Sequence, residues 1–189
     1  MVILETPLSG EVVKTLNVGD IVAINGTLIT ARDLLSKHLY EGNASPIPLK
    51  SQALYHCGPI VLDNNGEWEV VAAGPTTSAR QEPFAWKIIE QTGLKALMGK
   101  GGMGEKTAKA CKEHGCIYLH AIGGAAQLLA EKITKVKSVH FLEEFGSPEA
   151  MWEFEVKNFP AVVTIDTRGN SLHHDILSKS EKALTALLP

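Results

Sequence analysis

Three cationic side chains stand where predicted strands give way to predicted helices. Arg32 lies in the stretch "TARD", Arg80 ends "GPTTSAR", and Lys100 lies inside "GKGGMG". Ligands of α/β sheets collect at such strand ends, so we expect the three side chains to share one site. A guanidinium binds a carboxylate through two parallel hydrogen bonds. The pattern therefore predicts a site for a small polycarboxylate.

Hydroxyl groups accompany one of these cations. Thr76, Thr77 and Ser78 precede Arg80. They are typical of helix caps, and they would also serve proton transfer beside a ligand. Arg32 stands in the first turn of a predicted helix, where a positive charge opposes the helix dipole. A ligand explains it, and so does a surface salt bridge to Asp33 or another acid.

The glycine-rich stretch has more than one interpretation. Gly99, Gly101 and Gly104 form a literal G-x-G-x-x-G, which is typical of dinucleotide-binding loops. Two features argue against a nicotinamide oxidoreductase: no acid follows at the expected distance, and the motif comes late in the chain. A loop with Lys100 and a free helix N-terminus would equally bind a small carboxylate. A tight connection with a solvated lysine is the alternative.

The elements that position these residues alternate after a strand-rich first third. Residues 21–30, "IVAINGTLIT", predict a β-hairpin that turns at Asn25-Gly26, a pair that favours type I′ turns. Pro83 is tolerated only in a first helical turn, so a helix is predicted from Glu82. Further helices are predicted within 31–42, 100–115, 123–133, 148–154 and 179–188. Strands are predicted within 53–62, 67–74, 94–99, 116–122, 138–145 and 159–172. This order predicts a mixed α/β domain, residues 1–189, whose later strands are largely parallel.

Composition bounds the class of protein. The 189 residues are 44% hydrophobic and 21% charged, with a formal net charge of −3. These values give no electrostatic case for nucleic acid or for an anionic membrane. No basic segment precedes an apolar stretch at the N-terminus, and no apolar run reaches the ~20 residues that span a bilayer, so we expect a cytoplasmic protein.

Cysteines and histidines give no metal motif. The three cysteines, an odd number, favour a reducing compartment, and we interpret them as buried thiols. His56 and His120 lie in apolar strand patterns and are expected in or next to the core. Adjacent residues seldom face one way, so His173, His174 and Asp175 predict a solvated loop.

Several stretches together resemble one known family. In order they are "GDIVAINGTLITARD", "CGPI", "AAGPTTSARQEP", "MGKGGMG", "YLHAIGGAAQLLA" and "FPAVVTIDTRGNSL". They are similar to the β subunit, or C-terminal domain, of class I iron–sulfur hydro-lyases, which are the class I fumarases and L-tartrate dehydratases. The resemblance covers about residues 16–172 and implies a swivelling β/β/α domain, a mixed sheet with helices packed around a β-rich core.

The resemblance also implies an assembly and a reaction. A cluster-bearing α subunit would hold a 4Fe-4S cluster through its own cysteines, in a dimer of heterodimers, and this chain would bind no metal. The reaction would be the reversible hydration of fumarate to (S)-malate, a step of the tricarboxylic acid cycle. L-tartrate dehydratase and mesaconate hydratase are the alternatives within the family. A non-catalytic dicarboxylate-binding or regulatory module is the alternative from another class.

Matching the motifs residue by residue assigns the site. Arg32, Arg80, Lys100 and Gly101 match positions that bind the dicarboxylate substrate. Thr76, with Arg80 and Lys100, would be catalytic, and its hydroxyl would move the proton at the substrate's C3. A threonine hydroxyl is a weak base, so it would need a carboxylate from the other subunit.

Overall fold

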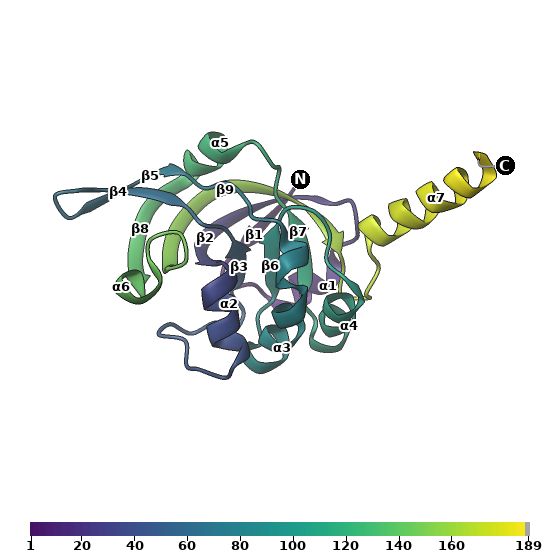
Figure 1. The fold of residues 1–189 in the computed structure, drawn as a ribbon, viewed down its shortest axis with the longest axis horizontal. Helices are drawn as coiled ribbons and strands as arrows, with labels where there is room; N and C mark the ends of the chain where they lie inside the picture. The colour runs from purple at the N-terminus through teal and green to yellow at the C-terminus, as the bar shows by residue number, and fades with distance from the viewer. Residues whose placement is uncertain (188–189) are drawn as a thin grey trace.

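A long mixed sheet organises the chain, and the computed structural model describes residues 1–187 (Figure 1). The strands are β1 (Val2–Glu5), β2 (Ile21–Ala31), β3 (Ala53–His56), β4 (Ile60–Asn64), β5 (Glu67–Ala72), β6 (Ala96–Gly99), β7 (Ile117–His120), β8 (Ile133–His140) and β9 (Met151–Ile165). The helices are α1 (Gly10–Thr15), α2 (Asp33–Tyr40), α3 (Glu82–Thr92), α4 (Glu105–His114), α5 (Ala126–Ala130), α6 (Leu142–Phe145) and α7 (Leu172–Leu187), with a 3-10 turn η1 (Ser78–Gln81).

The sheet closes on itself. Its order is β1-β2-β3-β6-β7-β9-β8, and β9 also pairs with β2. Strands β1, β2, β3, β6 and β7 run parallel, whereas β9 is antiparallel to β2, β7 and β8. Strands β2, β3, β6, β7 and β9 therefore form a ring, with helices α2, α3 and α4 outside it (Figure 1). The predicted α/β class, with helices around a β-rich core, is confirmed. The prediction that the later strands are largely parallel is wrong, because β9 runs antiparallel to both β7 and β8.

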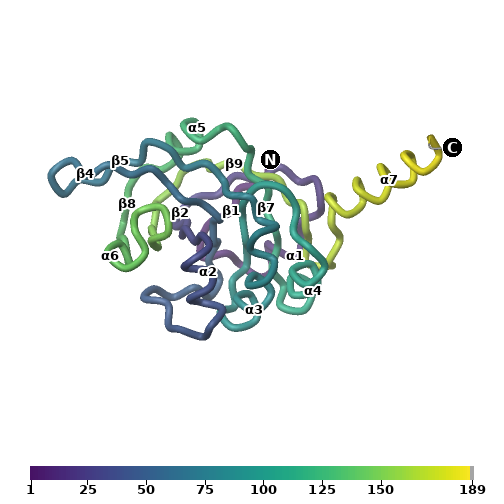
Figure 2. The backbone as a smooth tube through the Cα atoms, in the orientation of Figure 1, coloured from purple at the N-terminus to yellow at the C-terminus, as the bar shows by residue number. Residues whose placement is uncertain are grey.

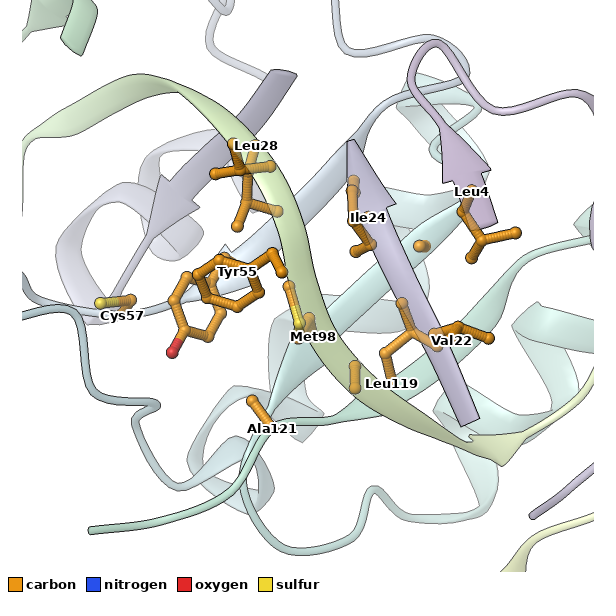
Figure 3. Close-up of a cluster of buried hydrophobic side chains, with 14 of the residues drawn as sticks. Leu4, Val22, Ile24, Leu28, Tyr55, Cys57, Met98, Leu119 and Ala121 are labelled. Atoms are coloured by element: carbon orange, nitrogen blue, oxygen red, sulfur yellow. The ribbon is translucent and has the colours of Figure 1, made fainter. Parts of the chain in front are cut away.

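Strand alternation sends side chains to two cores, because successive residues of a strand face opposite ways. Tyr55, Met98 and Leu119 belong to the first hydrophobic cluster, which the ring of strands encloses (Figure 3). Leu54 and Leu97, one position earlier on β3 and β6, belong to the other cluster. That second cluster also includes apolar residues of α2, α3 and α4, which explains why these helices cover the outer face.

The predicted hairpin at Asn25-Gly26 is wrong. Strand β2 runs unbroken from Ile21 to Ala31, and only the register against β9 shifts between Ile24 and Gly26. Gly26 has a φ of +90°, and a Cβ there would lie 2.6 Å from Thr6 Oγ1. The Asn-Gly pair therefore makes a β-bulge, which uses the same backbone freedom as a turn.

Two predictions in the last third are also wrong. The predicted helix 148–154 is mostly strand, because Trp152, Phe154 and Val156 alternate into the core of β9. The predicted strand 138–145 ends at His140, where Phe141 at φ +60° starts the short α6. Short apolar runs do not distinguish the two structures.

Two segments project from the body of the molecule (Figure 2). The β4-β5 hairpin extends on one side and α7 on the opposite side. The helix predicted at 179–188 starts earlier, at Leu172, and residue 188 lies outside the described residues. His173 and His174 thus lie in its first turn, not in a loop. Among residues 1–187, every helix falls short of the length and apolarity that a bilayer crossing needs.

Candidate functional site: a cationic edge of the sheet

Four adjacent parallel strands end together and create the candidate site. Strands β2, β3, β6 and β7 end at Ala31, His56, Gly99 and His120, and their carboxyl ends lie at one edge because the strands are parallel. Arg32 and Lys100 directly follow two of these strands. Ligands bind at the carboxyl ends of parallel strands both in open α/β sheets and in closed barrels.

Backbone hydrogen bonds bring Thr76 to Lys100. The Thr76 N–H donates to the His56 carbonyl at 2.7 Å, and the Lys100 N–H donates to the Thr76 carbonyl at 3.1 Å. The Ser78 N–H in turn donates to the Lys100 carbonyl at 2.9 Å. The segment before η1 thus lies beside the end of β6 as a short parallel bridge. Two predicted site residues are adjacent, and both are partly exposed.

A buried His–Ser pair lies at the same corner. His56 Nδ1 is 2.8 Å from Ser78 Oγ, and both residues are buried. Burial lowers the pKa of His56 to about 4, so the imidazole is neutral near pH 7. A Cβ on Gly99 would lie 2.0 Å from Ser78 Oγ and 3.1 Å from His56 Nδ1. Gly99 is therefore needed for close packing.

Arg80 is held by an acid from another corner. Its Nη2 pairs with Asp33 Oδ2, and the Gln81 side-chain amide donates to Asp33 Oδ1 at 2.6 Å. Asp33 is the first residue of α2, directly after Arg32. The Arg80 side chain remains 50% exposed, so part of its guanidinium is available to a ligand. Asp33 thus ties Arg80 to the start of the helix that follows Arg32.

Arg32 pairs with Glu149 rather than with its neighbour Asp33. Its Nε lies 3.2 Å from Glu149 Oε1, and the other oxygen of that carboxylate accepts the Leu34 N–H at 2.8 Å. A Cβ on Gly58, just after β3, would lie 3.0 Å from Arg32 Nη1. The Arg32 side chain therefore lies against the segment that follows β3.

The glycine-rich loop is pinned from both sides. Gly101 adopts φ +73°, and its carbonyl accepts the Tyr118 hydroxyl at 3.0 Å. Glu82 caps α4: its Oε2 accepts the Gly104 N–H and the Thr107 hydroxyl, each at 2.7 Å. Glu82 thus accepts two of the N–H groups at this helix start, and binding of an anion by the rest of the loop stays a prediction.

A cavity of about 780 Å³ lies away from the predicted cations. It is bounded by the glycine-rich loop, α4 and the start of α7, and its lining includes Gly102, His173 and Leu177 but none of Arg32, Arg80 and Lys100. The structure thus brings the backbones of Thr76 and Lys100 together and pairs Arg80 with Asp33, the residue after Arg32. That the three cations share one site stays a prediction.

The cysteines are buried thiols. Burial raises the pKa of Cys57 above its usual range, although Arg32 acts in the opposite direction. Cys111 and Cys116 contact each other at the end of α4, and the Cys111 pKa is raised by that contact and by burial. Within residues 1–187, no group of three His, Cys, Asp or Glu side chains is arranged to hold a metal ion.

Sequence reasoning missed Gln81, Glu82 and Glu149, and it gave Asp33 as a possible partner of Arg32 rather than of Arg80. Gln81 and Glu82 follow Arg80 directly, and Asp33 follows Arg32, but their partners lie far away in the sequence. Glu149 reaches α2 from beyond β8. The sequence places Asp33 next to Arg32 and Glu82 two residues after Arg80, but it does not reveal which acid pairs with which cation.

The fold is an α/β domain with cations at adjacent strand ends, two of which are paired with acids. Comparison with known proteins identifies its family: the chain belongs to the Fumarase C-terminus family, whose model matches residues 1–176. The resemblance inferred from the motifs is confirmed.

Three relatives indicate the range of the family. The chain is 53% identical over 186 residues to a putative class I fumarate hydratase of Geobacillus stearothermophilus, covering 98% of this chain and 36% of that protein. It is 41% identical over 186 residues to a putative L(+)-tartrate dehydratase subunit beta of Methanocaldococcus jannaschii, covering 96% and 95%. It is 43% identical over 173 residues to the L(+)-tartrate dehydratase subunit beta of Escherichia coli K12, covering 90% and 85%.

Proposed function

We propose that this chain is the β subunit of a hydro-lyase that reversibly hydrates fumarate to (S)-malate. Its family and its 53% identity to a protein named as a class I fumarate hydratase support the reaction. The observation that carries the proposal is the backbone link between Thr76 and Lys100, which brings the hydroxyl-bearing segment before η1 to the strand end that carries the lysine. Relatives named as tartrate dehydratases favour a second candidate, the dehydration of L-tartrate to oxaloacetate.

The three cations have the chemistry to bind a dicarboxylate. The exposed part of the Arg80 guanidinium offers paired N–H donors, and Lys100 adds a compact charge from the end of β6. Arg32 adds a third charge, and the turn at Gly101 lets the ligand approach the backbone. Negative charge grows on the carboxylate next to the carbon that loses a proton, and fixed cations stabilise this charge.

Thr76 is our candidate for proton transfer at C3. Its N–H and carbonyl are both hydrogen-bonded in the backbone, so its backbone is held beside the ends of β3 and β6. Water and alcohol hydroxyls are weak bases, and a threonine needs a neighbouring carboxylate to accept its proton. In the arrangement we propose, the partner subunit supplies that carboxylate.

A 4Fe-4S cluster would act as a Lewis acid toward the substrate hydroxyl when bound. The residues of this chain do not fit it: Cys57 is buried apart from Cys111 and Cys116, which lie in the other core cluster. We therefore assign the cluster to a partner α subunit and derive no step of this chain through it. We further propose a dimer of heterodimers, in the reducing cytoplasm that three free thiols favour.

Reconstitution tests the function. This chain is produced with a candidate α-type partner, the complex is loaded with iron and sulfide without oxygen, and fumarate, (S)-malate, L-tartrate and mesaconate are assayed. We expect fumarate and (S)-malate to interconvert fastest, and only when both chains are present. Turnover of L-tartrate without turnover of fumarate would replace our proposal with the second candidate. Binding of dicarboxylates without any turnover by the loaded complex would support a binding or regulatory module.

A further inference from the structure

A single aspartate joins the two arginine-bearing corners of the site. Asp33 accepts Arg80 Nη2 on one carboxylate oxygen and the Gln81 amide at 2.6 Å on the other. Asp33 belongs to α2, whereas Arg80 and Gln81 belong to η1. The Asp33 carboxylate thus connects α2 to η1, and each of its two oxygens accepts one contact.

The surroundings of this pair favour a fixed geometry. Gln81 is buried, and Asp33 is 36% exposed, so the pair is only partly solvated. The backbone of α2 at Asp33 is itself fixed, because Glu149 accepts the next N–H, that of Leu34, at 2.8 Å. A guanidinium has five N–H donors, so one contact to Asp33 leaves several donors for a ligand.

We propose that Asp33 is a positioning residue that holds the Arg80 guanidinium in its substrate-binding orientation. The proposal rests on the proposed function, because it assigns Arg80 to the substrate. Asp33 acts only through Arg80: it does not touch the substrate, and its charge limits the rotamers that a long arginine side chain would otherwise sample. Binding then costs less conformational entropy.

The first test measures Arg80 directly in the full chain, without a partner or substrate. Phenylglyoxal modifies accessible arginines, and mass spectrometry reports the rate at each of the three arginines in the sequence. In Asp33→Asn we expect Arg80 to react roughly threefold faster, as for the loss of a partly exposed ion pair. Arg168 is an internal control, since Asp166 holds it at 2.6 Å. An unchanged Arg80 rate would overturn the proposal.

The second test is a double-mutant cycle in the reconstituted complex. We expect Asp33→Asn to raise KM roughly three- to tenfold with a smaller fall in kcat, since one charged contact is removed. In an Arg80→Ala background the same change should alter KM less than about twofold, because its target is gone. Asp33→Glu should restore part of the affinity. The control is Glu41→Gln, which removes an acid from a solvated pair with Lys37 beyond the end of α2.

The outcomes separate the two proposals. An undiminished effect of Asp33→Asn in the Arg80→Ala background would show that Asp33 acts by another route. A lower KM in Asp33→Asn would show that the aspartate competes with the substrate, which also overturns positioning. A wild-type complex that turns over none of the four substrates would end the proposed function, while the phenylglyoxal rates would still decide whether Asp33 holds Arg80.

Discussion

The Lys100 N–H donates to the Thr76 carbonyl at 3.1 Å, so the strand end that carries the lysine and the segment that carries the threonine share one backbone ladder. The Thr76 N–H continues this ladder to His56, at the end of the next strand. Because backbone groups make these bonds, the side chains of Thr76 and Lys100 can be replaced without removing the scaffold that places them.

The hydroxyl of Thr76 gives the sharpest test of proton transfer. Thr76→Val keeps the shape and the backbone bonds but removes the hydroxyl, so we expect kcat to fall by roughly 10²–10⁴-fold. Thr76→Ser should keep much of the activity. The matched control is Thr77→Val, which removes an exposed hydroxyl one residue away. Steady-state kinetics of the complex measure all three variants. Equal activity of Thr76→Val and Thr77→Val would remove Thr76 from the mechanism.

We expect removal of the Arg80 guanidinium to weaken binding of the substrate. Removal of a charge-assisted hydrogen bond from a binding site costs about 1.5–3 kcal/mol, so Arg80→Ala should lower kcat/KM by roughly ten- to a hundredfold, mostly through KM. Arg80→Lys should recover only part of this, because an ammonium has no planar fork. Lys14→Ala, which removes an exposed cation of α1, is the control. A variant that turns over fumarate like the parent would show that Arg80 does not bind the substrate.

Local chemistry made much of the fold predictable. The helix from Glu82 follows from Pro83, and α4 ends at His114 because Gly115 adopts the left-handed conformation that glycine permits. The bulge in β2 was not predictable from Asn25-Gly26 alone. The strand continues because β9 pairs with it on both sides of the bulge, and this contact joins distant parts of the chain.

The site was predictable in its cations but not in its acids. Arg32 and Lys100 are recognisable because they follow strands, and strand ends of parallel sheets meet at one edge. Pairing of Asp33 with Arg80, and capping of α4 by Glu82, depend on how α2, α3 and α4 pack outside the ring. The sequence around each residue gives no information on that packing. Asp33, for example, is adjacent to Arg32 in the sequence but pairs with Arg80.

The packing at Gly99 predicts a strongly destabilising substitution. In Gly99→Ala the new methyl group would meet Ser78 Oγ at 2.0 Å, and overpacking of this kind costs about 1–3 kcal/mol of unfolding free energy. The control is Gly10→Ala, since nothing lies within 4 Å of its Cβ. Urea unfolding measures both.

The Ser78 hydroxyl provides a second check on that contact. Adding Ser78→Ala to Gly99→Ala removes the atom that clashes, so the double variant should be less destabilised than the sum of the two single variants. Strict additivity would show that the cost at Gly99 comes from elsewhere.

The neutral imidazole of His56 predicts a loss of stability in acid. Burial lowers its folded-state pKa to about 4, below the usual 6.5, so between these values the unfolded chain binds more protons than the folded chain. The neutral His56 side chain therefore makes its full contribution to the unfolding free energy above about pH 6.5. This contribution decreases as the pH falls and levels off below about pH 4, after a loss of about 3 kcal/mol. Urea unfolding from pH 7 to pH 4 measures this. In His56→Asn the fall in unfolding free energy between pH 7 and pH 4 should be smaller by about 3 kcal/mol. Parallel plots of unfolding free energy against pH for the two proteins would contradict this prediction.

We expect removal of the Glu82 carboxylate to destabilise the start of α4 and the glycine-rich loop before it. It accepts the Gly104 N–H, the Thr107 hydroxyl and, at 3.2 Å, the Thr107 N–H. Glu82→Ala would leave these donors without an acceptor from α3, at a cost of about 1–2 kcal/mol, as for the loss of a helix cap. Amide exchange at Gly104 and Thr107 should accelerate, because the start of α4 would open more often. Glu90→Ala, an exposed change in the same helix, should leave exchange at both amides unchanged. If Glu82→Ala also left it unchanged, α4 would not depend on this cap, and the loop that carries Lys100 would be held by the Tyr118 hydroxyl on the Gly101 carbonyl.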